Sequence, residues 1–133
     1  MSITEDGREG EDKTRLIIKK CGWNLFQIDW MAVKGGKYFL FESKNKEFFT
    51  PPPFLGTGLN IGQVIAREEF RKKIGIRTIL FVFNKETGDS YFQFLDKLEQ
   101  GEKHDTKNKI RIYPIKNYIK LNDPSDLENA LKD

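Results

Sequence analysis

The stretch YFLFESKNK, residues 38–46, decides how this chain is interpreted. It opens with four apolar residues, which is typical of a buried strand. Because side chains alternate along a strand, Glu42 and Lys44 then continue the face that carries Tyr38 and Leu40. A carboxylate and an ammonium in such a row are either a surface ion pair at a half-exposed strand end or part of a site at the edge of the core.

The preceding segment brings in a second carboxylate. Residues 25–33 (LFQIDWMAV) and 37–44 (KYFLFESK) are predicted as strands joined by a tight hairpin turn at Gly35–Gly36. Pairing across this turn places Asp29 beside Glu42 at the open end of the hairpin. Two carboxylates this close repel each other unless a cation joins them. Mg²⁺ is the natural bridge, because it prefers oxygen ligands and keeps several waters.

A helix is predicted over residues 9–21, with Gly22 as its C-cap. Glu11 shares a helical face with Ile18 and Cys21, which are core-type residues, so it is the acid of this helix that we expect to point inward. The alternative is that Glu11 decorates an exposed helix start, where the macrodipole favours acids.

A second helix is predicted from its cap at Asn60 to about Lys73. Gln63 lies on the same stripe as Phe70 and Ile74, so a polar amide occupies an otherwise apolar row that we expect to face inward. The alternative is an exposed helix residue. Polar side chains from the two helices and the hairpin are thus expected to converge: Glu11, Asp29, Glu42, Lys44 and Gln63.

The rest of the chain is predicted to form a loop, further strands and a terminal helix. Three consecutive prolines predict a stiff loop over residues 48–60 (FFTPPPFLGTGLN), whose glycine-rich end is interpreted as a flexible turn before the second helix. Together these elements predict an α/β layer fold in one domain, residues 1–133, with a loose lead-in over 1–8. The further elements expected are strands at 78–83, 91–95 and 109–115, and a short helix from Asp123.

The composition limits which partners, metal sites and locations we expect for the chain. The 133 residues are 38% hydrophobic and carry a net charge of +3, which permits a polyanionic partner without requiring one. A single cysteine, Cys21, cannot form an internal disulfide, which is typical of a protein in a reducing cytosol. With only His104 beside it, a zinc site built from cysteine and histidine is nearly excluded. No apolar run approaches about 18 residues, so no membrane span is expected.

The spacing Asp29-(x)₁₂-Glu42-x-Lys44 after an acidic helix resembles the PD-(D/E)xK nuclease superfamily, with Ile28 at the position of the proline. The resemblance is closest to Holliday-junction resolvases of the Hjc and RecU types and covers roughly residues 7–98. The chain lacks the long basic N-terminal region of RecU-type proteins, and its FFTPPPF loop differs from theirs. Four segments match these resolvases: EDKTRLIIKKCGW, GGKYFLFESK, GLNIGQVIAREEF and GIRTILFVF.

This resemblance implies a restriction-endonuclease-like core, a mixed central sheet flanked by helices. It implies a Mg²⁺-dependent DNA endonuclease, with Mn²⁺ as a substitute, that acts on DNA including branched DNA as a cytoplasmic or nucleoid-associated homodimer. Asp29 and Glu42 would be metal ligands, and Glu11 a ligand directly or through water. Lys44 would orient or help deprotonate the attacking water, and Gln63 would support that water or a phosphate oxygen. Hydrolysis of a phosphodiester needs such activation of water and such charge stabilisation.

Contact with the nucleic acid is assigned to basic residues and loop aromatics. The aromatics Phe48, Phe49 and Phe54 could stack on bases; the alternative is a solvated helix face with core phenylalanines. Other readings of the whole chain are a small restriction, repair or phage nuclease of this fold, and a nucleic-acid-binding module without catalysis. The candidate phosphate-binding residues are Lys34, Lys37, Lys46, Arg67, Arg71 and Lys72.

Overall fold

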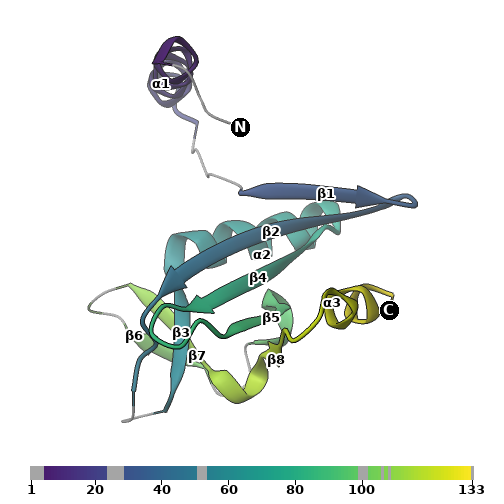
Figure 1. The fold of residues 1–133 in the computed structure, drawn as a ribbon. Helices are drawn as coiled ribbons and strands as arrows, with labels where there is room; N and C mark the ends of the chain where they lie inside the picture. The colour runs from purple at the N-terminus through teal and green to yellow at the C-terminus, as the bar shows by residue number, and fades with distance from the viewer. Residues whose placement is uncertain are drawn as a thin grey trace.

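The structure is a computed structural model that describes residues 5–23, 29–50, 54–98, 102–105, 107 and 109–132 (Figure 1). The helices are α1 (Glu5–Lys20), α2 (Ile61–Ile74) and α3 (Pro124–Leu131), with short 3₁₀ turns at Leu95–Lys97 and Ile115–Asn117. The strands are β1 (Trp30–Lys34), β2 (Lys37–Lys46), β3 (Gly56–Asn60), β4 (Arg77–Asn84), β5 (Ser90–Phe94), β6 (Lys103–Asp105), β7 (Ile110–Pro114) and β8 (Ile119–Lys120).

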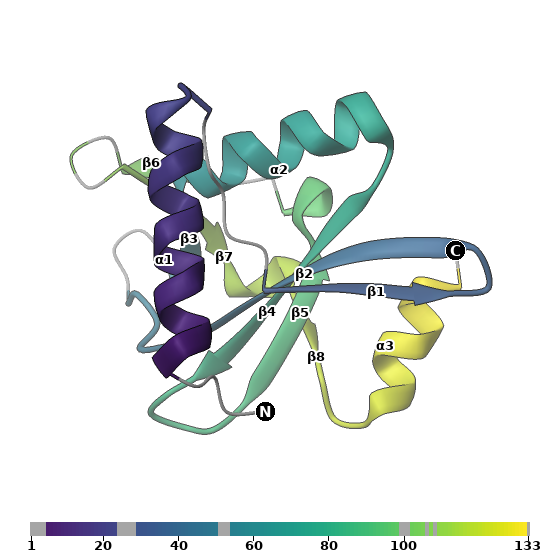
Figure 2. The same ribbon diagram turned by 90° about the horizontal axis from the view of Figure 1, so that it is seen from above.

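A five-stranded sheet in the order β1-β2-β4-β5-β8 forms the centre of the fold. β2 and β4 are parallel, whereas the other neighbours are antiparallel. Figure 2 shows α2 and α3 on opposite sides of this sheet. The predicted α/β fold with a mixed central sheet flanked by helices is therefore confirmed. The run TILFVF at 78–83, apolar after Thr78, lies in β4 between β2 and β5, as the burial of its apolar residues requires.

α2 connects two parallel strands and therefore runs antiparallel to them. Its predicted cap is confirmed, because the Asn60 side chain accepts a hydrogen bond from the Gly62 N–H at 2.8 Å. Gly75 ends the helix in the left-handed region, with φ of 84°. A core that includes Leu80 and Val82 of β4 and Val64 of α2 is buried on this side of the sheet.

The glycine-rich end of the predicted loop is not a flexible turn. Residues 56–60 form β3, which pairs with β7 in a second, three-stranded sheet that β6 completes. Gly58 lets the backbones approach, since a Cβ there would lie 2.0 Å from the Arg111 carbonyl oxygen. Glycine lowers strand propensity in the sequence, which is why this strand was missed. The short strands β6 and β8 were not predicted either.

The other face of the central sheet is aromatic and is covered by α3. Ile79, Phe92 and Phe94 are buried there, with Leu127 and Leu131 of α3 packed against them. α3 begins at the predicted cap Asp123, in a capping box with Asp126.

α1 stands off from the sheet, beyond β1 (Figure 1). It begins at Glu5, so the predicted lead-in over 1–8 is wrong for residues 5–8. Acidic side chains near a helix N-terminus are favoured by the macrodipole, which accounts for this longer helix. From Gly7 to Lys20 every residue is exposed except the half-buried Ile18. Within the described ranges, none of the helices combines the length and the apolar character that crossing a bilayer requires.

Candidate functional site

Asp29 and Glu42 are neighbours across the β1–β2 hairpin, as predicted. The register pairs Trp30 with Phe41, so the residue before β1 lies opposite Glu42. Asp29 Oδ2 accepts a hydrogen bond from the Ser43 N–H at 2.8 Å, which fixes the half-buried carboxylate against β2. The negative charge of Asp29 is close enough to help raise the pKa of Glu42. Residues 24–28, the predicted start of this strand, lie outside the described residues.

Glu42 is buried and bound to an arginine of α2. Its side chain is 1% exposed, and that of Arg67 is 3% exposed. Arg67 Nε donates to Glu42 Oε1 at 3.0 Å, and Nη2 donates to the same oxygen. Burial raises the pKa of Glu42 above its ordinary value, while the hydrogen bond and charge of Arg67 act in the opposite sense.

Lys44 lies two residues beyond Glu42 on the same face of β2 and is half-buried. Its positive charge favours the ionised form of Glu42 and so acts to lower the pKa of that carboxyl group. Within the described part of the chain, the Lys44 ammonium forms no hydrogen bond or ion pair, so it is available to a bound anion. The Glu42–Lys44 surface ion pair that the sequence allowed is not formed, because Arg67 takes that place.

Lys46 continues the same face and joins the two sheets. Its ammonium donates to the Gly58 carbonyl of β3 at 2.8 Å. Burial lowers the pKa of Lys46, and the neighbouring charge of Lys44 lowers it further. Lys44 and Lys46 therefore lie on one face at the end of β2, and burial and mutual repulsion act against the charged form of Lys46.

Gln63 lies on α2 one turn before Arg67 and is half-buried. Because α2 and β2 are antiparallel, Gln63 and Lys44 are displaced in the same direction from the Glu42–Arg67 pair. The predicted inward stripe was only partly right: the buried residues of α2 are Val64 and Arg67, whereas Ile74 is exposed. An arginine can face the core here because Glu42 neutralises it, which apolar periodicity does not reveal.

Glu11 is not brought to this site, so the expectation that it points inward does not hold in the structure. Its side chain is 52% exposed, and its nearest cation is Arg15 on its own helix, at 3.6 Å. The expected inward neighbour Cys21 is exposed too. The physical reason is that α1 stands off from the sheet, so that among the described residues it has no core to face.

The basic residues assigned to phosphate contact differ in their burial and in the partners that they bind. Arg67 is buried on Glu42 and is not available to a phosphate, which corrects that assignment. Arg71 bonds to Glu68, with a contact of 2.6 Å, and lies 3.8 Å from Asp96. Lys34 and Lys72 are exposed, and Lys46 is bonded as described above.

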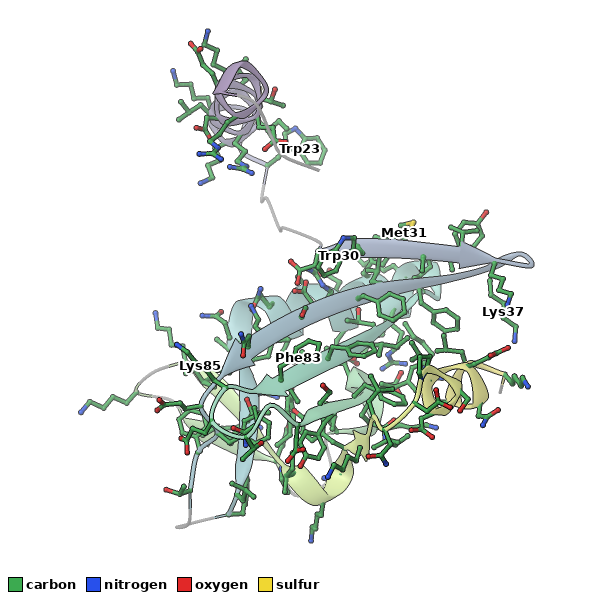
Figure 3. All side chains as sticks on the ribbon, viewed as in Figure 1. Trp23, Trp30, Met31, Lys37, Phe83 and Lys85 are labelled. Carbon is green, nitrogen blue, oxygen red and sulfur yellow. The ribbon has the colours of Figure 1, made fainter. Side chains whose placement is uncertain are left out.

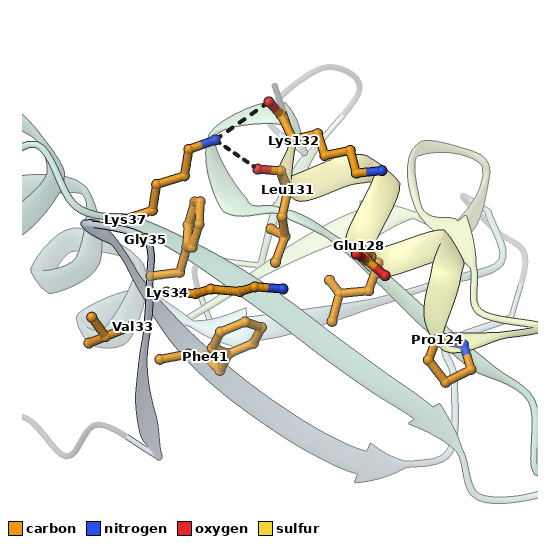
Figure 4. Close-up of a pocket in the computed structure, with 12 residues that line it drawn as sticks. Val33, Lys34, Gly35, Lys37, Phe41, Pro124, Glu128, Leu131 and Lys132 are labelled. Atoms are coloured by element: carbon orange, nitrogen blue, oxygen red, sulfur yellow. Dashed lines mark hydrogen bonds between the residues drawn. The ribbon is translucent and has the colours of Figure 1, made fainter.

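Lys37 belongs to an apolar groove between the β1–β2 hairpin and α3 (Figure 4). The groove has a volume of about 580 Å³. The Lys37 ammonium lies 3.5 Å from the carbonyl oxygens of both Leu131 and Lys132, at the end of α3. Phe39 and Phe41 form part of its wall, so the groove lies on the face of the sheet opposite Glu42 and holds none of the predicted site carboxylates.

The loop aromatics divide between core and surface. Phe48 is buried in the core beside Tyr91, as the alternative reading had it. Phe49 is exposed and pairs with Gly56 through two backbone hydrogen bonds, whereas Phe54 is half-buried. Of these three aromatics, only Phe49 presents a side chain of which more than a third is exposed.

The nuclease resemblance implies a divalent ion, and Asp29 and Glu42 are the carboxylates that could hold it. Asp29 and Glu42 are adjacent carboxylates, which suits Mg²⁺, an ion that binds proteins through one or two carboxylates and keeps the rest of its ligands as water or substrate oxygens. The described residues contain no group of three or more acidic, histidine or cysteine side chains that could hold a metal. Asp29 and Glu42 match this smaller, two-carboxylate donor set, in which Glu42 already has a cationic partner.

No protein-family model matches the chain, and no curated protein matches its sequence. Among solved structures, the chain is similar to Hjc from Archaeoglobus fulgidus, described as a Holliday junction resolvase from an archaeal hyperthermophile. The two share 15% sequence identity, the TM-score is 0.45, and the match covers 84% of this chain and 91% of that one. At this identity and TM-score the likeness assigns no function to this chain.

Proposed function

We propose that the chain is a metal-dependent endonuclease that hydrolyses phosphodiester bonds in DNA, with a preference for branched DNA. The observation that supports it is the adjacency of Asp29 and Glu42 across the hairpin, with Lys44 half-buried on the same face of β2. A buried carboxylate beside a second one is costly for a fold, so its presence at the edge of the core favours a chemical role.

Asp29 and Glu42 would hold Mg²⁺, which when bound lowers the pKa of a coordinated water and neutralises charge on a phosphate. Lys44 would orient the attacking water and place a positive charge beside the phosphoryl oxygens in the transition state. Gln63, displaced along α2 toward Lys44, would donate to that water or to a phosphate oxygen. Lys46 lies two residues beyond Lys44 on the same face of β2, where a phosphate of the polyanion could approach it.

The second candidate is a nucleic-acid-binding module without catalysis. It is favoured by one observation: Arg67 occupies Glu42 as a metal ion otherwise would. The two candidates differ in whether Asp29 and Lys44 are needed for cleavage or only for binding.

The chain would act as a homodimer through the exposed side of the β1–β2 hairpin. Trp30 and Met31 project from β1, the edge strand of the central sheet (Figure 3). Met31, Val33 and Tyr38 share one face of the hairpin and are each about half exposed. An apolar edge strand is a template for pairing, and a second copy related by twofold symmetry would cover it.

Cleavage assays on four-way junction, flap, nicked and linear duplex DNA, with Mg²⁺ or with EDTA, test the proposed function. Cleavage of the junction in Mg²⁺ and none in EDTA is expected. Equal rates on junction and linear duplex would overturn the preference for branched DNA alone. Binding of DNA without cleavage of any substrate, in Mg²⁺ or Mn²⁺, would favour the non-catalytic module.

A further inference from the structure

We infer that Arg67 is an internal counter-cation of Glu42 that competes with a divalent metal ion for this carboxylate, so that Arg67 limits the affinity of the site for metal. This inference rests on the proposed function, since it assumes that Asp29 and Glu42 form the metal site.

The contacts of Arg67 support this role. Two guanidinium nitrogens, Nε and Nη2, donate to the same oxygen of Glu42, Oε1, which concentrates the positive charge on one ligand atom. Both side chains are almost fully buried, so water screens the pair very little. Arg67 belongs to α2 and Glu42 to β2, so the ion pair also joins the helix to the sheet.

A metal ion on Glu42 would meet this charge at close range. An ion at about 2.1 Å from Oε1 would lie within roughly 5 Å of the Arg67 nitrogens. A divalent and a monovalent cation at that separation repel each other strongly where the effective dielectric constant is low. Either Arg67 leaves Glu42 when metal binds, or both cations remain at a cost in affinity, and removing the positive charge of Arg67 tightens metal binding in both cases.

Arg77 also forms an ion pair, but this pair lies outside the candidate metal site. Arg77 forms a fork with Asp96, with both nitrogen–oxygen distances at 2.7 Å, but neither residue belongs to the candidate site. Arg77→Gln therefore removes the same charge and breaks a partly exposed ion pair, with side chains 30% and 17% exposed, without touching Glu42. It serves as the matched control for a general loss of stability.

Mn²⁺ affinity is measured by isothermal titration calorimetry on wild type, Arg67→Gln, Arg67→Lys and Arg77→Gln. Arg67→Gln is expected to bind Mn²⁺ at least about tenfold more tightly than wild type. Arg67→Lys keeps the charge and is expected to stay within about threefold of wild type, as is Arg77→Gln. Equal or weaker binding by folded Arg67→Gln would overturn the inference.

A second measurement needs no variant of Arg67. In the NMR spectrum of wild type, the Arg67 Nε–H resonance is expected to shift along the Mg²⁺ binding curve, while that of Arg77 stays in place. An unchanged Arg67 resonance at saturation with Mg²⁺ would overturn the inference. Mn²⁺ binding that Asp29→Asn does not weaken would instead overturn the metal site, and the proposed function with it.

Discussion

Glu42 combines three features that rarely coincide in one side chain: it is buried, it is charged, and it lies beside a second carboxylate. Burial and the negative charge of Asp29 raise its pKa, and the hydrogen bond and charge of Arg67 oppose them. The fold therefore buries the Glu42 carboxylate, which disfavours its charged form, and places the Arg67 guanidinium against it. This pattern is common where a site is chemically active.

The raised pKa of Glu42 has a consequence for stability. Below its ordinary pKa of 4.5 the group is protonated in both states, and as the pH rises through the higher folded pKa the native state bears the charged form at a cost. The free energy of unfolding of wild type relative to Glu42→Gln is therefore expected to be largest at acid pH and to fall as the pH rises. Urea denaturation of both proteins between pH 4 and 8 measures this difference; a difference that grows with pH would contradict the account.

Asp29→Asn separates function from stability. The amide oxygen can still accept the Ser43 N–H bond, while the loss of charge relieves the repulsion of Glu42. We expect DNA cleavage to fall at least about 100-fold, whereas the melting temperature stays the same or rises. Asp89→Asn, which changes a turn residue paired with Lys120, is the matched control and leaves both unchanged. A fully active Asp29→Asn would refute the assignment of this carboxylate.

For individual residues, the sequence predicted part of the candidate site. Asp29 and Glu42 were predicted as neighbours because hairpin register follows from the turn. Arg67 was assigned to phosphate contact, since a basic helix residue is ordinarily solvated and no periodicity marks an arginine that is paired inside. Glu11 was expected to point inward, but the orientation of a helix depends on what it packs against, which sequence pattern alone does not contain.

Among the elements, β3 shows most clearly how close packing selects residues. A Cβ at Gly58 would lie 2.0 Å from a β7 carbonyl oxygen, so Gly58→Ala is expected to destabilise the protein by about 1–3 kcal/mol. Gly10→Ala in α1 meets no atom within 4 Å and is expected not to lower stability. Urea denaturation of the two variants tests this, and a Gly58→Ala variant as stable as wild type would show that β3 does not pair as described.

The β1–β2 hairpin carries the prediction about assembly. Val33→Lys places a charge on the exposed apolar face of the edge strand and is expected to convert a dimer into a monomer. Ile119→Lys, on β8 at the opposite edge of the sheet, is expected to remain dimeric. Light scattering after gel filtration measures both masses; a wild type that is monomeric at micromolar concentration would refute the dimer proposal.

Element prediction succeeded where local signals are strong. β2, β4 and α2 lie where expected, because apolar runs, the Asn60 cap and the terminating glycine each have a local physical cause. The second sheet was missed because β3 owes its pairing to Gly56 and Gly58, residues that otherwise indicate a turn. β6 and β8 are too short for their periodicity to be recognised.

For the whole molecule, we propose that Asp29, Glu42 and Lys44, which the mixed sheet presents at the edge of the core, together cleave phosphodiester bonds. Because α2 leads into β4, the parallel pairing of β4 with β2 positions α2 relative to Glu42. The hairpin register places Asp29 beside Glu42. Lys44 follows toward the end of β2, where a DNA backbone would approach.

Single-turnover cleavage of a four-way DNA junction tests this proposal. Wild type in Mg²⁺ is compared with wild type in EDTA and with Lys44→Ala in Mg²⁺, and junction binding is measured on the same samples. The account predicts cleavage by wild type only with the metal, and loss of at least about 100-fold in Lys44→Ala with junction affinity largely retained. Cleavage by Lys44→Ala at the wild-type rate, or no cleavage by wild type, would contradict it.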